Sequence, residues 1–184
     1  MSTISDPLTE KLIADLYRTE GKAEIVDGRI VLKSPTGELP GTAAGEILFS
    51  LYAYAKRYGG RACNGSVALL ADLPNRESFC PDASYYTGPR AGMKFRPIPP
   101  DFAAEVRSDD DYGTGAEREM AKKRTDYFAA GTKVVWDVDV LSEDVVRVYR
   151  AGVPEQPTIY RRGERAEAEP AVPGWTMPVD ELFE

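Results

Sequence analysis

The sequence predicts one α/β domain built on a mixed β-sheet, and three observations indicate it. Two segments with the apolar spacing of helices, residues 41–60 and 115–132, alternate with short runs of strand character. The pair Asp27–Gly28 lies between two apolar runs, which is the strongest short-range signal for a β-hairpin. The 184 residues contain no internal repeat and no interior linker, so we expect a single domain over residues 1–184.

The N-terminal segment, residues 1–20, is expected to form a helix over the core. Asp6 followed by Pro7 is typical of a helix N-cap with proline at the first helical position. We expect this helix to end near Arg18. The hairpin around Asp27–Gly28 then contributes two antiparallel strands.

Two longer segments have the pattern of amphipathic helices. In residues 41–60 the Gly59–Gly60 pair supplies the stop signal, and in residues 115–132 Gly131 lies at the C-terminal capping position. We expect both helices to pack on the sheet. The apolar stripe of the first one consists of Ala44, Ile47, Leu48, Leu51, Ala55 and Tyr58.

The remaining segments supply the strands of the expected sheet. Three runs of strand character follow the first long helix, at residues 61–73, 78–88 and 101–108. Because Pro, Gly and Asn separate them, we expect three neighbouring strands. Residues 133–139 and 144–150 predict a hairpin with a four-residue turn, and residues 151–184 predict a C-terminal strand and tail.

The composition excludes several kinds of site. The chain has no histidine, which removes the commonest general base and every histidine-ligated metal. Cys63 and Cys80 are too few and too far apart for a cysteine zinc site, and we expect buried thiols. A net charge of -7 argues against tight nonspecific binding to nucleic acid, although a local basic patch is compatible with it. Any catalysis must use carboxylates, lysine, tyrosine or a hard cation.

The chain also lacks the signals of a membrane protein. No apolar run approaches the ~20 residues of a membrane span, and the N-terminus lacks the basic-then-apolar pattern of a signal peptide. We therefore expect a cytoplasmic protein with no membrane partner. Exposed apolar strands and the tail around Trp175 could serve a homodimer.

The stretch PPDFAAEVRS contains the first candidate carboxylates. Alternation along a strand places Asp101, Glu105 and Arg107 on one face. At ~3.3 Å per residue the backbones of Asp101 and Glu105 lie about 13 Å apart, too far for one hard cation with ligands at about 2 to 2.5 Å. A partner for Glu105 is better sought on a neighbouring strand, about 5 Å away, where Asp82 is the natural candidate.

The second long helix offers a cationic complement. Lys123 shares a helix face with Met120 and Tyr127, whereas Lys122 points about 100° away. An ammonium group that faces the sheet needs an anionic neighbour, which Glu105 and Asp82 would provide. Two carboxylates and a lysine are suited to binding Mg²⁺ or Mn²⁺ and to polarising a phosphate and a water.

Each of these side chains also has a purely structural interpretation. Lys123 lies four residues after Glu119, the spacing of an ordinary surface ion pair on a helix. Asp82 follows a proline and could cap a turn. The loop at residues 108–113 is expected to be solvated and lacks the later glutamate of an EF-hand. Polar faces of strands are the expected places of Asp101, Arg107, Asp137 and Asp139.

Three segments, taken together, carry a family resemblance. PDASYY, PPDFAAEVRS, and KRTDYFAAGTKVVWDVD followed by VVRVYR resemble the Uma-two-type family of endonucleases, within the PD-(D/E)xK, restriction-endonuclease-like superfamily. The similarity runs from AEIVDGRIVLKSPTG to about Arg150. The resemblance implies a restriction-endonuclease-like fold, a mixed central sheet flanked by helices. It also implies a Mg²⁺-dependent endonuclease that hydrolyses phosphodiester bonds of nucleic acid, with DNA as the expected partner.

The resemblance further implies roles for individual residues. Asp82 matches the family's first aspartate and Glu105 its glutamate, and both would hold the metal. The lysine usually found two residues after that glutamate is replaced here by Arg107. In this family the lysine lies on the following helix, four residues before a tyrosine, and Lys123 matches it. Glu24 matches a glutamate ahead of the Asp–Gly turn and could be an extra metal or water ligand, which completes the expected catalytic set.

An alternative function is a nuclease-fold domain that acts in binding or assembly without catalysis. The acidic net charge favours it, as does the absence of a histidine that many relatives carry near the positions of Pro40 and Gly41. Hydrolysis of a smaller phosphate ester is a third possibility.

Overall fold

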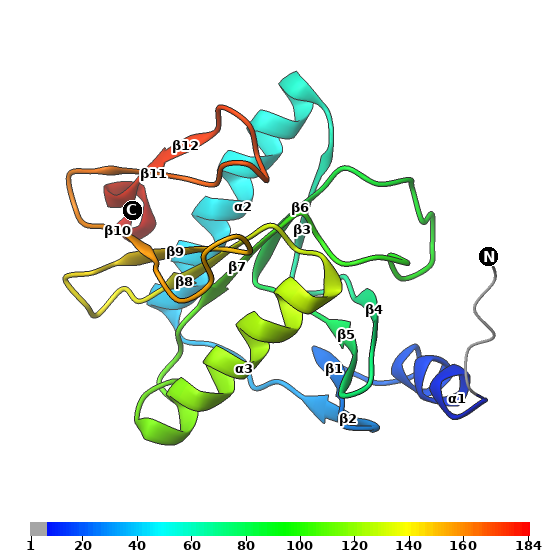
Figure 1. The fold of residues 1–184 in the computed structure, drawn as a ribbon. Helices are drawn as coiled ribbons and strands as arrows, with labels where there is room; N and C mark the ends of the chain where they lie inside the picture. The colour runs from blue at the N-terminus through cyan, green and yellow to red at the C-terminus, as the bar shows by residue number, and fades with distance from the viewer. Residues whose placement is uncertain (1–6) are drawn as a thin grey trace.

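Residues 7–184 form two β-sheets, three α-helices and a small C-terminal hairpin (Figure 1). The structure is a computed structural model and describes residues 7–184; the expected N-cap Asp6 lies outside the described residues. The elements in chain order are α1 (Pro7–Leu16), β1 (Ala23–Val26), β2 (Arg29–Leu32), α2 (Glu38–Tyr58), β3 (Arg61–Asn64), β4 (Leu69–Leu73), β5 (Arg76–Phe79), β6 (Ala83–Tyr86), β7 (Phe102–Val106), α3 (Thr114–Ala130), β8 (Val134–Val138), β9 (Val146–Arg150), β10 (Thr158–Tyr160), β11 (Arg165–Glu167), β12 (Thr176–Pro178) and the 3₁₀ helix η1 (Val179–Phe183).

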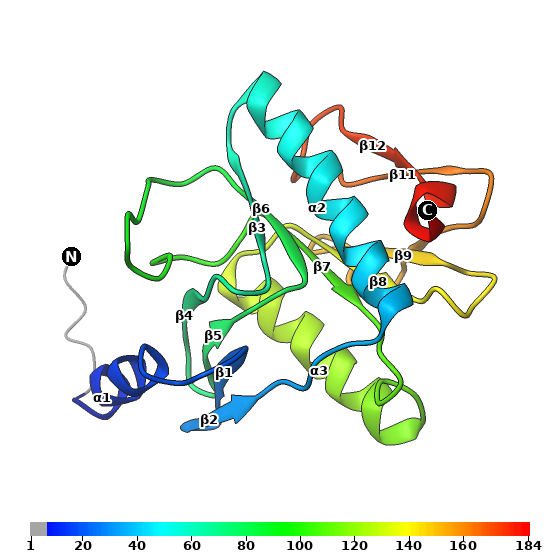
Figure 2. The ribbon, with the colours of Figure 1, turned by 180° about the vertical axis from the view of Figure 1, so that it is seen from behind.

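A six-stranded mixed sheet forms the centre, in the order β10-β9-β8-β7-β6-β3. β7 and β8 are parallel, with Glu105 opposite Asp137, and the other neighbouring strands are antiparallel. Parallel neighbours need a crossover, and α3 supplies it between β7 and β8. Helices α2 and α3 cover opposite faces of this sheet, as the front and rear views show (Figures 1 and 2).

The alternation expected along residues 101–108 is confirmed in β7. Phe102 and Ala104 are buried on the α2 face, where Ile47 and Leu51 of α2 pack in the main core. Ala103 is buried on the other face with Tyr127 of α3. Glu105 therefore points to the α3 side of the sheet, since it is two residues from Ala103.

A second sheet, in the order β2-β1-β5-β4, lies beside the first. The predicted hairpin is confirmed, because Asp27 and Gly28 have φ of 50° and 67° and pair Val26 with Arg29. The three neighbouring strands expected from residues 61–73, 78–88 and 101–108 are confirmed in the central sheet as β3, β6 and β7, but the first run is not a single strand. The first run splits into β3 and β4, which belong to different sheets, because a turn after Asn64 redirects the chain.

The helices agree with the sequence patterns except at their ends. Helix α1 ends at Leu16, two residues before the expected Arg18. Helix α2 begins at Glu38, earlier than the expected residue 41, because its first turn accommodates a proline. Tyr58, expected in the apolar stripe of α2, is 63% exposed at the helix end. The C-cap of α3 is confirmed, since Gly131 is left-handed with φ of 109°.

The C-terminal segment is more structured than the expected single strand and tail. It contains β10, the β11–β12 hairpin and η1, and it covers the end of the main core. Trp175 is 4% exposed and stacks on Trp136 with ring centroids 5.0 Å apart. The Trp175 ring itself is therefore part of the core.

Two further expectations concern the cysteines and the membrane. Cys63 and Cys80 are buried free thiols, as predicted. Among the helices of residues 7–184, none is long and apolar enough to cross a membrane.

Candidate active site

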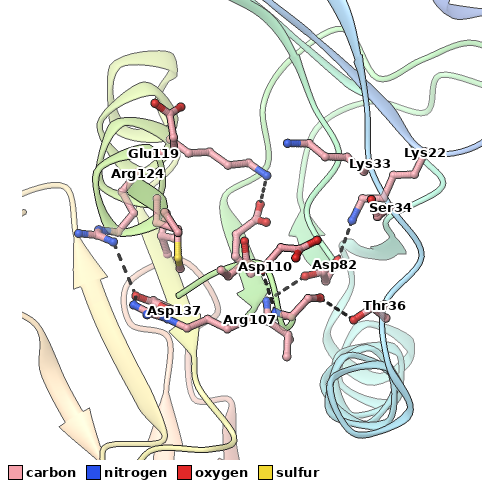
Figure 3. A pocket seen from close by; sticks show the side chains of 18 of the residues that line it. Lys22, Lys33, Ser34, Thr36, Asp82, Arg107, Asp110, Glu119, Arg124 and Asp137 are labelled. Atoms are coloured by element: carbon pink, nitrogen blue, oxygen red, sulfur yellow. Dashed lines mark hydrogen bonds and ion pairs between the residues drawn. The ribbon is translucent and has the colours of Figure 1, made fainter. Parts of the chain in front are cut away.

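Three predicted site residues from three different parts of the chain meet at one cavity of about 430 Å³ (Figure 3). Asp82 lies just before β6, Glu105 on β7 and Lys123 on α3. The register that places Ala83 opposite Ala104 brings Asp82 beside Glu105 on adjacent antiparallel strands. The cross-strand partner expected for Glu105 is therefore where the alternation argument places it.

Lys123 is the centre of the charge arrangement. Its Nζ lies 2.8 Å from Glu105 Oε1 and 3.0 Å from Glu24 Oε1, so it makes these ion pairs in place of the helical pair with Glu119. Burial alone would lower the pKa of Lys123, but the two carboxylates outweigh it and raise that pKa above its ordinary value. Lys123 is therefore an ammonium ion at neutral pH and has no free lone pair to act as a base. Lys122 points elsewhere, to Asp27 at 3.3 Å.

Glu105 also accepts a hydrogen bond from a second residue of helix α3. The hydroxyl of Tyr127 donates to Glu105 Oε1 at 2.6 Å. Burial raises the pKa of Glu105, Lys123 opposes this shift, and the negative charge of Asp82 adds to it. Burial and the adjacent carboxylates also raise the pKa of Tyr127, which keeps the phenol protonated as a donor.

Asp82 is held between strand β7 and Lys22, a residue that no sequence motif indicates. Its Oδ2 accepts the backbone N–H of Val106 at 2.8 Å, and its Oδ1 accepts Lys22 Nζ at 2.6 Å. The alternative that Asp82 caps a turn is therefore wrong. Lys22 immediately precedes β1 and lies two residues before Glu24, so strand alternation could have placed it on the same side as Glu24.

Glu24 is fully buried and is surrounded by donors of the protein itself. Besides Lys123, it accepts the backbone N–H of Cys80 at 2.9 Å and Arg76 Nη1 at 2.9 Å, and it pairs with Lys33 at 3.7 Å. Burial raises the pKa of Glu24, but these cations and the backbone donor outweigh it and hold that pKa at about 2. Glu24 is thus placed to orient Lys123.

The Glu24 contact with Arg76 begins a longer buried network. Arg76 Nε donates to Asp126 Oδ2 of α3 at 2.9 Å, and Asn75 donates to Asp126 Oδ1 at 2.9 Å. Arg76 and Asp126 could not be predicted from the sequence, because no local pattern links residues that are 50 positions apart. The network ties α3 to the β4–β5 turn and so supports the position of Lys123.

Arg107, Asp137 and Asp139, which were expected on polar strand faces, are in fact buried. Arg107 donates to Asp137 from Nε and Nη2, both at 2.8 Å, and also binds Glu117 of α3. Arg107, Asp137 and Asp139 are all below 10% exposed, because the sheet face that carries them is covered. Because the guanidinium group of Arg107 is engaged in this bidentate pair with Asp137, the cation beside Glu105 is Lys123.

Asp101 lies at the other end of β7 from Glu105. Its carboxylate accepts the Thr87 backbone N–H at 2.8 Å and hydroxyl at 2.7 Å, and it pairs with Lys133 at 2.8 Å. These contacts connect the β6–β7 loop to the start of β8. Asp101 is separate from the Asp82–Glu105 pair, as the strand spacing predicted.

The donor set at the cavity is compatible with a water-rich cation site. Within residues 7–184, no group of three or more His, Cys, Asp or Glu residues is arranged to hold a metal ion. Mg²⁺, however, usually keeps several waters and binds through one or two carboxylates. Asp82 and Glu105 supply two such carboxylates, and both line the cavity. They fit Mg²⁺ or Mn²⁺ and do not form an all-protein cage.

Comparisons with known proteins agree with this fold. No curated protein is similar enough to count as a match. A crystal structure described as "a putative nuclease belonging to DUF820", from Anabaena variabilis, is 18% identical, with a TM-score of 0.72 over 94% of this chain and 97% of that chain. That likeness confirms the predicted mixed α/β nuclease fold. The family model Uma2, described as "Putative restriction endonuclease", matches residues 10–180. The chain therefore belongs to the Uma2 family, as the motifs around Asp82, Glu105 and Lys123 predicted.

Proposed function

We propose that this protein is a divalent-cation-dependent endonuclease that hydrolyses phosphodiester bonds of nucleic acid, with DNA as the expected substrate. The observation that carries the proposal is the meeting of Asp82, Glu105 and Lys123 at one cavity, although they are far apart in sequence. Membership of a family described as restriction endonucleases supports the same reaction class.

The residues at the cavity have distinct roles in this proposal. Asp82 and Glu105 would hold Mg²⁺ or Mn²⁺, which supplies Lewis-acid polarisation of the phosphate and the attacking water. Lys123, as a fixed ammonium group, orients the water and offsets negative charge on the phosphate. Glu24 and Tyr127 are positioning residues, because they hold Lys123 and Glu105 through the contacts at 3.0 Å and 2.6 Å.

Cleavage assays with a charge-neutral variant test the proposal. Single- and double-stranded DNA are incubated with wild type and Glu105→Gln in Mg²⁺, in Mn²⁺ and in EDTA. We expect cleavage by wild type with either cation and a loss of at least about 100-fold in Glu105→Gln, the scale of losing a charge-stabilising group. Glu143→Gln, an exposed change in the β8–β9 loop, is the matched control and should cleave like wild type. No cleavage with any cation, or equal cleavage by Glu105→Gln and wild type, would overturn the proposal.

One observation favours the alternative of a nuclease fold that binds or assembles without catalysis. Each cavity carboxylate already has a lysine partner, since Lys22 lies 2.6 Å from Asp82 and Lys123 lies 2.8 Å from Glu105. The pair is thus neutralised by side chains alone. Calorimetric titration with Mn²⁺ separates the two functions. Micromolar binding that Asp82→Asn abolishes supports the nuclease, whereas the absence of binding to wild type supports the alternative.

A further inference from the structure

Two lysines stand side by side at the end of the β1–β2 hairpin, on the wall of the cavity opposite α3. Lys22 precedes β1 and Lys33 follows β2, and the Lys33 backbone N–H donates to the Lys22 carbonyl at 2.8 Å. This bond continues the hairpin ladder by one pair, so the two residues are cross-strand neighbours. Both side chains line the cavity, as Figure 3 shows.

Like charges directly opposite each other destabilise a sheet unless anions compensate them. Lys22 has a close partner in Asp82 at 2.6 Å. The ion pair of Lys33 with Glu24 is long, 3.7 Å, and the same Glu24 oxygen already accepts Arg76 at 2.9 Å. The side chain of Lys33 is also 38% exposed. Lys33 therefore places a positive charge at the cavity and would lose only a long ion pair when it binds an anion.

The negative net charge of the chain makes these two lysines important for attracting an anionic ligand. The chain has a net charge of -7, so a polyanion must be attracted by a local concentration of cations. Lys22 and Lys33 supply two positive charges on the hairpin wall, and Lys123 supplies one on the α3 wall. The carboxylates proposed to hold the cation lie between these walls.

We propose that Lys22 and Lys33 form a phosphate-binding element that holds the backbone of the polynucleotide next to the bond that is cleaved. This inference rests on the proposed function and assigns a substrate contact to the hairpin. Contacts of this type recognise the phosphodiester backbone and no base sequence. Lys33 makes its contact directly, whereas Lys22 exchanges Asp82 for the phosphate.

Salt dependence of DNA binding tests the element without relying on cleavage. Fluorescently labelled single- and double-stranded oligonucleotides are titrated in Mg²⁺ buffer with Glu105→Gln, which prevents cleavage, and with the same protein carrying Lys33→Met or Lys22→Met/Lys33→Met. Each lost phosphate contact should reduce the slope of log affinity against log salt by about 0.7 to 0.9. Between 50 and 200 mM salt, the fall in affinity should therefore shrink about 3-fold for Lys33→Met and about 10-fold for the double variant.

Two controls make the result specific. Lys56→Met removes an exposed lysine from the far end of α2 and should leave the slope unchanged. Lys33→Arg keeps the charge and should restore the slope that Lys33→Met loses, which a merely structural role of Lys33 would not require. Thermal melting confirms that each variant folds.

The outcomes separate this inference from the proposed function. Unchanged slopes in both Lys33→Met and the double variant, in a protein whose wild type cleaves DNA, overturn the phosphate-binding element alone. Absence of DNA binding by the Glu105→Gln background overturns it as well. Absence of cleavage by wild type overturns the proposed function, and binding with the expected slopes would then favour a noncatalytic DNA-binding role for the same lysines.

Discussion

Replacing Glu24 by glutamine should cost stability in a strongly pH-dependent way. The amide has the size of the carboxyl group and its oxygen can still accept the Cys80 N–H, so the change removes charge with little change in packing. Burial raises the pKa of Glu24, but Lys123, Lys33, Arg76 and the Cys80 N–H bring it down from 4.5 to about 2. At 1.36 kcal/mol for each pKa unit, this shift corresponds to about 3 kcal/mol of folding free energy at pH 7.

The sign of the pH dependence follows from the direction of the shift. A carboxyl group whose pKa is lower in the folded state binds fewer protons there, so its contribution is complete well above pH 4.5 and is lost as the pH falls towards 2. The free energy of unfolding of wild type should therefore exceed that of Glu24→Gln by about 3 kcal/mol at pH 7 and by about 1.4 kcal/mol at pH 3.

Urea unfolding of wild type and Glu24→Gln at pH 7, 5 and 3 measures these differences. Glu143→Gln, on the exposed β8–β9 loop, is the matched control and should stay within about 0.5 kcal/mol of wild type at each pH. A cost for Glu24→Gln that is below about 1 kcal/mol at pH 7, or that is equal at pH 7 and pH 3, would refute the assignment of a stabilising buried charge at this position.

Three further predictions concern the neighbouring groups. Tyr127→Phe removes the hydroxyl that donates to Glu105 at 2.6 Å; urea unfolding should show a loss of about 1 to 2 kcal/mol, and kcat should fall less than in Glu105→Gln. Arg107→Lys replaces a bidentate partner by a point charge, so unfolding should show a loss of about 2 to 4 kcal/mol; a gain in cleavage would contradict the assignment of Arg107 to structure. Lys123→Met should abolish cleavage at each DNA concentration at which wild type is assayed. Lys122→Met, one position along the same helix, should retain cleavage.

Local chemistry explains which parts of the fold could be predicted from the sequence. The Asp27–Gly28 turn and the Gly131 cap are set by residues that tolerate positive φ, so short patterns identify them. The division of the strands between two sheets depends on pairings such as Val26 with Arg76, which are distant in sequence. No local signal distinguishes such a pair from a neighbour in the central sheet, so the sequence did not predict that β4 and β5 belong to a second sheet.

The candidate site divides in the same way. Strand alternation and register place Asp82 beside Glu105, and helical phase together with the family motif points Lys123 towards them. The partners that hold these groups could not be predicted, because each is chosen by tertiary packing. Arg107 illustrates the limit: alternation gives its face correctly, but the sequence does not reveal that α3 covers this face and buries its pair with Asp137.

The position of Lys123 shows why the N-terminal hairpin belongs to the site. Its ammonium group is held from one side by Glu105 of the central sheet and from the other by Glu24 of the second sheet. A buried charge with a missing partner costs several kcal/mol, so neither carboxylate can be lost without weakening the position of Lys123. The cavity thus lies between the two sheets. The hairpin contributes Lys22 and Lys33 to the cavity lining and the buried Glu24 behind that lining. It therefore forms one wall of the site as well as covering the core.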